Sequence, residues 1–149
     1  MSDSLLRFIP ADPEFRPSPS ATTSAEVFLR GLLPEAERVS ARCLAGVEFV
    51  DAGANWEGVH CSVCGADAES WWSDAMSQAA ESGFHSLQVM SGCCRRAVSL
   101  NELRYGWPVG FASFVLEAQN PQSTGLTASQ LAQLSGIVGS PLLEIPVHL

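Results

Sequence analysis

The sequence predicts an α+β fold, in which short strands are mixed with two or three packed helices. Two capping boxes, Thr23-Ser24-Ala25-Glu26 and Thr127-Ala128-Ser129-Gln130, each predict the start of a helix, because paired side chains there satisfy free backbone N–H groups. Several short β-branched or alternating segments predict strands. The order of these elements is irregular, with no repeat and no linker that divides the chain, which favours α+β.

The N-terminal region contains four of the nine prolines within residues 1–22. Proline fixes φ and removes a backbone donor, so this segment is expected to be an extended arm, with a short strand at residues 5–9. Residues 23–149 are expected to form a single α+β domain. Its first helix begins at Thr23 and ends or kinks at Pro34.

The central part of the chain predicts one helix between strands. Asp67 is placed to cap a helix from about Glu69 to Ser82, and Gly83 follows its end. Strands are expected on both sides of this helix, at residues 38–41, 46–50, 58–60, 86–90 and 96–100.

The C-terminal part predicts a further helix. Residues 109–118 form an apolar run that fits either a buried strand or a helix. The capping box at Thr127 opens a helix that ends at Gly139 and Pro141. Residues 142–149 are expected to close the fold as a strand.

The composition excludes several classes of function. The chain is 46% hydrophobic and 16% charged, which excludes intrinsic disorder. Eight basic residues, all arginine, stand against sixteen acidic ones and give a net charge of −8. An acidic surface repels nucleic-acid phosphates and anionic membranes, so neither is expected as a partner. A clustered face of Arg38, Arg42, Arg95 and Arg96 is the arrangement that would reverse this expectation for nucleic acid.

The N-terminal residues lack the basic and apolar regions of a secretion signal, and the apolar runs are too short to span a bilayer. We therefore expect a cytoplasmic protein whose thiols stay reduced. The five cysteines are an odd number, which fits a disulfide framework poorly and favours metal ligands or redox groups.

Cys61-Ser62-Val63-Cys64-Gly65 resembles the C-x-x-C-G knuckle of zinc ribbon and rubredoxin-type proteins, as in a small bacterial member of that group. Two residues between the thiols let both sulfurs face one ion, and the glycine accepts the positive φ of the turn. A second pair, Cys93 and Cys94, follows after 28 residues. The resemblance implies a tetrahedral zinc site of Cys61, Cys64, Cys93 and Cys94 within a segment of about 58–100.

The second pair departs from the family pattern because its cysteines are adjacent. Neighbouring side chains of a strand point to opposite faces, so both thiolates reach one ion only if the chain turns sharply, which Gly92 makes feasible. Otherwise His85 or His60 replaces one cysteine, or the cluster is a buried thiol or redox group without metal. Cys43 lies outside the cluster and is expected to be a small buried hydrophobe.

The sequence leaves three functional hypotheses. The first is a zinc-stabilised, acidic, non-catalytic module that binds another protein, because its charge would complement a basic partner as in immunity or antitoxin factors. Trp71, Tyr105 and Trp107 are the candidate partner-binding residues. The others are a metal- or thiol-dependent enzyme and a zinc-ribbon nucleic-acid binder. The sequence leaves the oligomeric state open, a homo-oligomer included.

Overall fold

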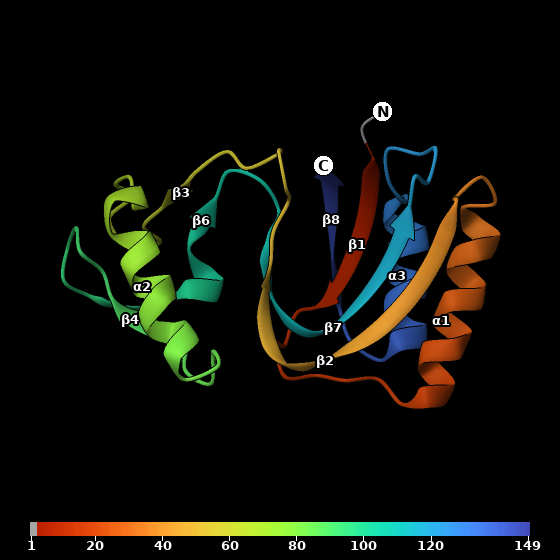
Figure 1. Cartoon of the computed structure of the whole chain (residues 1–149), viewed down its shortest axis with the longest axis horizontal. Coiled ribbons are helices and arrows are strands. Elements are labelled where there is room, and N and C mark those ends of the chain that lie inside the picture. The colour runs from red at the N-terminus through yellow and green to blue at the C-terminus, as the bar shows by residue number, and fades with distance from the viewer. Residues whose placement is uncertain (1–2) are drawn as a thin grey trace.

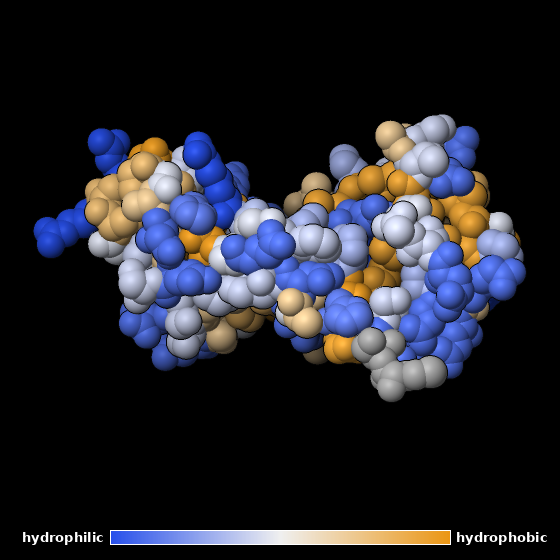
Figure 2. All heavy atoms as spheres, turned by 90° about the horizontal axis from the view of Figure 1, so that it is seen from above, coloured by the Kyte–Doolittle hydropathy of each residue, from blue (hydrophilic) through white to orange (hydrophobic). Residues whose placement is uncertain are grey.

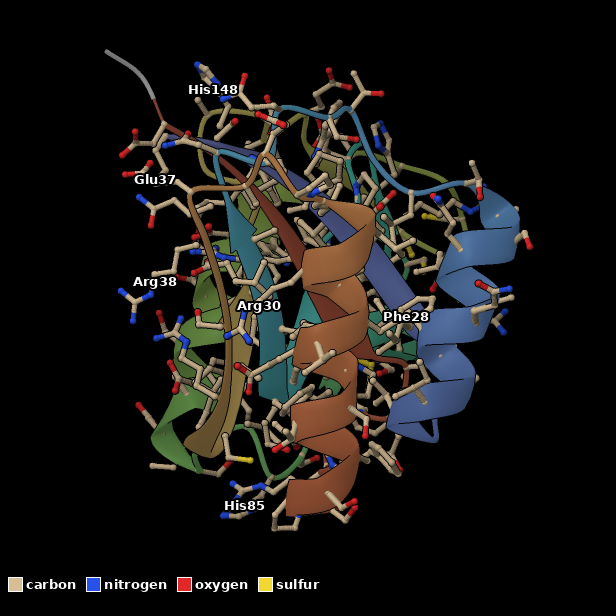
Figure 3. The ribbon with its side chains drawn as sticks, turned by 90° about the vertical axis from the view of Figure 1, so that its right-hand side faces the viewer. Phe28, Arg30, Glu37, Arg38, His85 and His148 are labelled. Carbon is tan, nitrogen blue, oxygen red and sulfur yellow. The ribbon has the colours of Figure 1, made fainter. Side chains whose placement is uncertain are left out.

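Four antiparallel strands form a sheet in the order β2-β7-β1-β8. The computed structural model describes residues 3–149. The strands span Ser4–Pro10 for β1, Arg38–Val50 for β2, Gly110–Gln119 for β7 and Leu142–His148 for β8. The helices α1 (Pro19–Leu32) and α3 (Ala128–Val138) lie side by side on one face of this sheet, as Figures 1 and 3 show.

The strand alternation explains why the helices cover this face. Leu6, Phe8, Val39, Leu116 and Ala118 point to one side of the sheet and pack with buried residues of α1 and α3. The elements β1-α1-β2 and β7-α3-β8 are two βαβ units of one antiparallel sheet, which is the split βαβ or ferredoxin-like topology. Such a topology carries no function by itself.

The remaining elements form a second lobe, inserted between β2 and β7. They are β3 (Val59–His60), α2 (Glu69–Glu81), β4 (Gln88–Met90), β5 (Ala97–Ser99), a 3-10 turn (Leu100–Glu102) and β6 (Arg104–Tyr105). β3 pairs with β6, and β4 pairs with β5. Figure 2, viewed from above, shows the two lobes on either side of a narrower middle. Residues from the ends of β2 and β7, among them Val47 and Phe111, pack with α2 and join the lobes.

β2 is one bent strand where the sequence predicts two. Its register against β7 shifts between Cys43 and Glu48, so that residues 44–47 lie opposite Ser113 alone. A bulge of this kind bends a strand and increases its twist. The bend carries β2 from the helix-covered sheet toward the inserted lobe (Figure 1).

The α+β class with its three helices is confirmed, and the open segment 109–118 is the strand β7. The capping box at Thr127 is also confirmed. The helix start at Thr23 is wrong. The N-cap is Ser18, whose Oγ accepts a hydrogen bond from the Ala21 N–H at 3.1 Å. Pro19 then takes the first helical turn, where its missing N–H costs nothing.

The N-terminal segment expected as an arm supplies β1 and the first turn of α1. β1 lies between β7 and β8 in the centre of the sheet. Residues 1 and 2 lie outside the described part. Within residues 3–149, no helix has both the length and the apolar character needed to cross a membrane.

Candidate metal centre

The first half of the site is a tight turn between β3 and α2. The Cys61 N–H donates to the Ala66 carbonyl at 2.8 Å, and the Gly65 N–H donates back to the Cys61 carbonyl at 3.0 Å. Gly65 has a φ of +76°, the left-handed conformation that glycine adopts without steric cost. The Val63 N–H points at the Cys61 sulfur, 3.4 Å away. The chain therefore forms the knuckle that the C-x-x-C-G pattern predicts.

The second half repeats this turn between β4 and β5 with a different sequence. The Ser91 N–H donates to the Arg96 carbonyl at 2.9 Å, and the Arg95 N–H donates to the Ser91 carbonyl at 3.0 Å. Arg95 has a φ of +54°. Position for position, Ser91 corresponds to Cys61, Cys94 to Cys64, and Arg95 to Gly65.

The two knuckles bring the four cysteine sulfurs together. Cys61 Sγ lies 3.8 Å from Cys94 Sγ, and Cys64 Sγ lies 3.4 Å from Cys93 Sγ. All four sulfurs lie within 4.8 Å of one another. A tetrahedron of thiolates with zinc–sulfur bonds of about 2.3 Å has edges of about 3.8 Å. The four sulfurs are therefore close enough to hold one metal ion, and neither His85 nor His60 belongs to the group.

The surroundings of the sulfurs shift two thiol pKa values in opposite directions. Hydrogen bonds from the backbone N–H groups of Cys64 and Val63 lower the pKa of Cys61 from 9.0 to about 6. Loss of water around Cys93, followed by its hydrogen bond with the Cys64 thiol, raises its pKa to about 11. The thiolate is the form that binds metal. The Cys61 thiol therefore ionises more readily than the Cys93 thiol.

Ser91 is a residue of the site that the cysteine pattern does not reveal. It is 1% exposed, as Cys61 is 0% exposed in the first knuckle. Its Oγ lies 3.1 Å from Cys94 Sγ and accepts a hydrogen bond from the Arg96 N–H at 3.0 Å. The available signal is the spacing S-x-x-C at 91–94, which repeats C-x-x-C at 61–64. The second knuckle thus keeps the fold of the first but moves one thiol from its first to its third position.

Gly92 is required by packing rather than by its conformational freedom. Its φ is not positive, and the left-handed residue of this turn is Arg95. A Cβ at position 92 would lie 2.8 Å from the Cβ and the Cγ of Trp71. The glycine therefore lets α2 approach the second knuckle.

The three candidate partner-binding residues are half-buried. Trp71 lies against the second knuckle, and its buried Nε1 has no hydrogen-bond partner among the described residues. The Tyr105 hydroxyl donates to the Leu100 carbonyl at 2.6 Å, and Trp107 Nε1 donates to the Pro146 carbonyl at 2.8 Å. Their role toward a partner stays a prediction.

The structure also shows where Cys43 and the four arginines named in the sequence analysis lie. Cys43 is exposed on β2, so the expectation of a buried residue is wrong. Arg38 and Arg42 lie on β2, whereas Arg95 and Arg96 lie on the second knuckle, so these four arginines belong to different lobes. All five cysteines are free thiols.

Comparisons of this chain with protein-family models, with curated proteins and with solved structures find no match.

Proposed function

We propose that this protein is a zinc-stabilised, acidic, non-catalytic module that binds another protein. The observation that carries the zinc site is the approach of four sulfurs from two knuckles within 4.8 Å. Four thiolates in tetrahedral geometry are one of the usual donor sets of structural zinc. The ion would tie β3 and α2 to β4 and β5.

The donor set favours a structural ion over a catalytic one. Catalytic zinc keeps a position open for water or substrate, whereas four protein thiolates fill the tetrahedron. Four thiolates and one Zn²⁺ leave a local charge of −2. Arg95 and Arg96 follow the last ligand directly and can offset this charge.

The charge of the protein supports a basic protein as the partner. A net charge of −8 speeds encounter with a positive surface and opposes binding to nucleic acid. This is the charge relation of immunity and antitoxin factors toward basic toxins. A reducing compartment such as the cytoplasm would keep the cluster thiols available to metal.

Elemental analysis of protein purified without chelator tests the metal site. We expect one zinc per chain, and we expect Cys61→Ser or Cys94→Ser to lower this content. Cys43→Ser is the matched control, because Cys43 is exposed and outside the cluster. Metal-free wild-type protein that takes up no added zinc would contradict the proposal.

Reconstitution with a purified partner tests the binding role. A partner recovered from native lysate should be basic, bind at micromolar affinity or better, and bind less tightly as salt rises. Trp107→Ala should weaken the complex. The control is Val27→Ala, which changes an exposed apolar residue of α1 and should leave the complex unchanged. Failure to recover any such partner in repeated experiments would argue against this function.

Alkylation distinguishes this proposal from a thiol- or metal-dependent enzyme. Iodoacetamide should modify Cys43 readily and leave the four cluster cysteines protected while metal is bound. Rapid modification of one cluster cysteine with full retention of metal would instead indicate an available nucleophile.

A further inference from the structure

A cavity of about 370 Å³ lies on the face of the sheet opposite α1 and α3. It is lined by side chains of three adjacent strands, β1, β7 and β2. The lining includes three of the eight arginines of the chain, Arg7, Arg38 and Arg42, together with Ser40, Glu117 and Gln119. Leu5 and Leu149 complete its wall.

The strand geometry places these polar groups together. Arg38, Ser40 and Arg42 alternate along β2 with Val39 and Ala41, which pack toward the helices. Figure 3 shows Arg38 directed away from α1.

The register of the sheet continues this polar row across the neighbouring strands. Ser40 lies opposite Glu117, which lies opposite Arg7 on the other side. Gln119 stands next to Arg38 in the same way. The lining side chains are therefore set side by side by the pairing of the strands.

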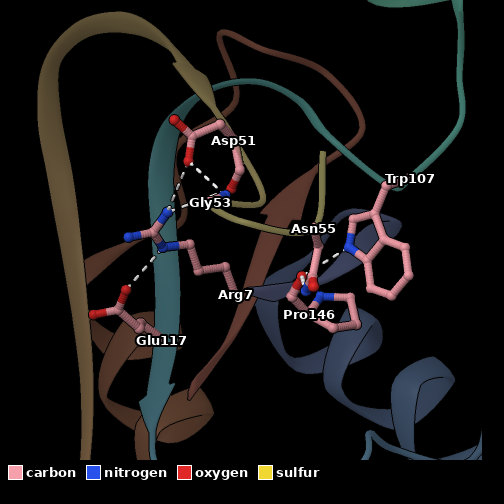
Figure 4. Close-up of polar contacts among 7 residues, drawn as sticks. All are labelled: Arg7, Asp51, Gly53, Asn55, Trp107, Glu117 and Pro146. Carbon is pink, nitrogen blue, oxygen red and sulfur yellow. Dashed lines mark hydrogen bonds and ion pairs between the residues drawn. The ribbon is translucent and has the colours of Figure 1, made fainter. Parts of the chain in front are cut away.

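The positive charges of the cavity are only partly neutralised. Arg7 Nε donates to Glu117 at 2.8 Å, and its guanidinium lies 3.8 Å from the Asp51 carboxylate (Figure 4). Among residues 3–149, neither Arg38 nor Arg42 forms an ion pair. Two unpaired cations on one cavity contrast with the charge of −8 of the whole chain.

We infer that this cavity binds a small anion that carries phosphate or carboxylate groups. Arg38 and Arg42 would supply fork-shaped donors on either side of the Ser40 hydroxyl, and the Gln119 amide would add a further donor. Glu117 is held by Arg7, which limits its repulsion of the anion. The volume is near the lower end of about 300–1,000 Å³ for ligand sites, which fits a metabolite rather than a polymer.

Calorimetric titration of the full-length, metal-loaded protein at low salt tests the site. The probes are inorganic phosphate, pyrophosphate and succinate, with a single-stranded RNA oligonucleotide for comparison. Each of the variants Arg38→Gln and Arg42→Gln should weaken binding by about tenfold or more, because each removes a charge-assisted hydrogen bond. The matched control is Arg104→Gln, which removes an exposed arginine from the other lobe and should leave affinity unchanged.

The pattern of binding distinguishes the ligand classes. Binding of pyrophosphate alone assigns phosphate chemistry, and binding of succinate alone assigns carboxylate chemistry. Three results would overturn the inference: no binding of any probe at millimolar concentration, an equal loss in Arg104→Gln, or binding confined to a single-stranded RNA oligonucleotide. Arg38 and Arg42 lie on β2 in the sheet lobe, whereas the four cluster cysteines lie in the inserted lobe. Metal content measured on the same variants therefore separates this test from that of the zinc site.

Discussion

The equivalence of Ser91 and Cys61 predicts that one ligand can be moved within the second knuckle. Cys93→Ser should weaken zinc binding, and adding Ser91→Cys should restore it. The reason is geometric: Ser91 makes the two turn-closing hydrogen bonds that Cys61 makes, and its Oγ already lies 3.1 Å from Cys94 Sγ. A sulfur at position 91 would face the ion from the place that Cys61 occupies in the first knuckle.

The size of the effect follows from the strength of structural zinc sites. Such sites contribute about 10–16 kcal/mol, so one thiolate of four accounts for about 2.5–4 kcal/mol, or about two to three orders of magnitude in affinity. Cys93→Ser should lose about this much. The double variant should recover most of it, because it again offers four thiolates.

Competition with a chromophoric chelator measures the affinities, and the thiolate-to-metal absorbance of the cobalt form counts the sulfur ligands. Cys43→Ser should behave as the wild type in both measurements. Wild-type affinity in Cys93→Ser would show that Cys93 is not a ligand. A double variant no tighter than Cys93→Ser would refute the equivalence of the two knuckles.

Chelation, alkaline titration and one backbone substitution test other parts of the structure. Removing the metal should increase amide hydrogen exchange in α2 and in residues 58–100 while the four-stranded sheet stays protected; equal exchange with and without metal would contradict this. Burial raises the pKa of Tyr105 from 10.0 to about 12, so its share of the free energy of unfolding, about 2–3 kcal/mol, is complete below pH 10 and lost as the pH rises to 12. Because Tyr105 is the single tyrosine, tyrosinate absorbance of the folded protein reports it directly, and a midpoint near 10 would be the contrary result. In thermal melts, Arg95→Gly should raise the free energy of unfolding by about 0.5–1 kcal/mol, because glycine adopts the left-handed conformation of this position without steric cost. Arg96→Gly is the control: its φ is not positive, so the substitution should lower the free energy of unfolding.

Local signals in the sequence predict much of the secondary structure. The Thr127 capping box and Gly139 predict α3 because the groups that satisfy its ends are adjacent in sequence. The start of α1 shows the limit of such signals. The Thr23 pattern lies inside the helix, where the Thr23 hydroxyl donates to the Pro19 carbonyl, because Ser18 and Pro19 offer an earlier start.

The arrangement of the sheet could not be predicted in the same way. The pairing of β1 with β7 joins residues more than 100 positions apart, and no local pattern specifies that register. Residues 44–47 contain a β-bulge that reads in sequence as a gap between two strands. The cavity on the open face depends on this register, so Arg7 could not be placed beside Arg38 and Arg42 before the strand order was known.

The four cysteines of the candidate site could be predicted because thiol spacing is a strong local pattern. The second knuckle could not be predicted in full. By spacing alone, the adjacent cysteines predict a sharp turn at Gly92, whereas the structure shows an ordinary knuckle whose first position holds Ser91. A turn is defined by its backbone hydrogen bonds, which two different sequences can share, and the ligand pattern alone does not show this.

The construction of the inserted lobe explains why it would need an ion that the sheet lobe does not. Its strand pairs contain only two and three residue pairs, and the buried positions of α2 are the small side chains Ala75 and Ala79. Isolated two-stranded pairs of this kind are marginal in water. Its larger apolar contacts lie at the junction with β2 and β7, where Phe49 packs against Trp72 with ring centroids 5.6 Å apart. The two knuckles follow β3 and β4, whose pairings are this short. A cross-link between the knuckles would therefore stabilise elements that few backbone pairs hold together.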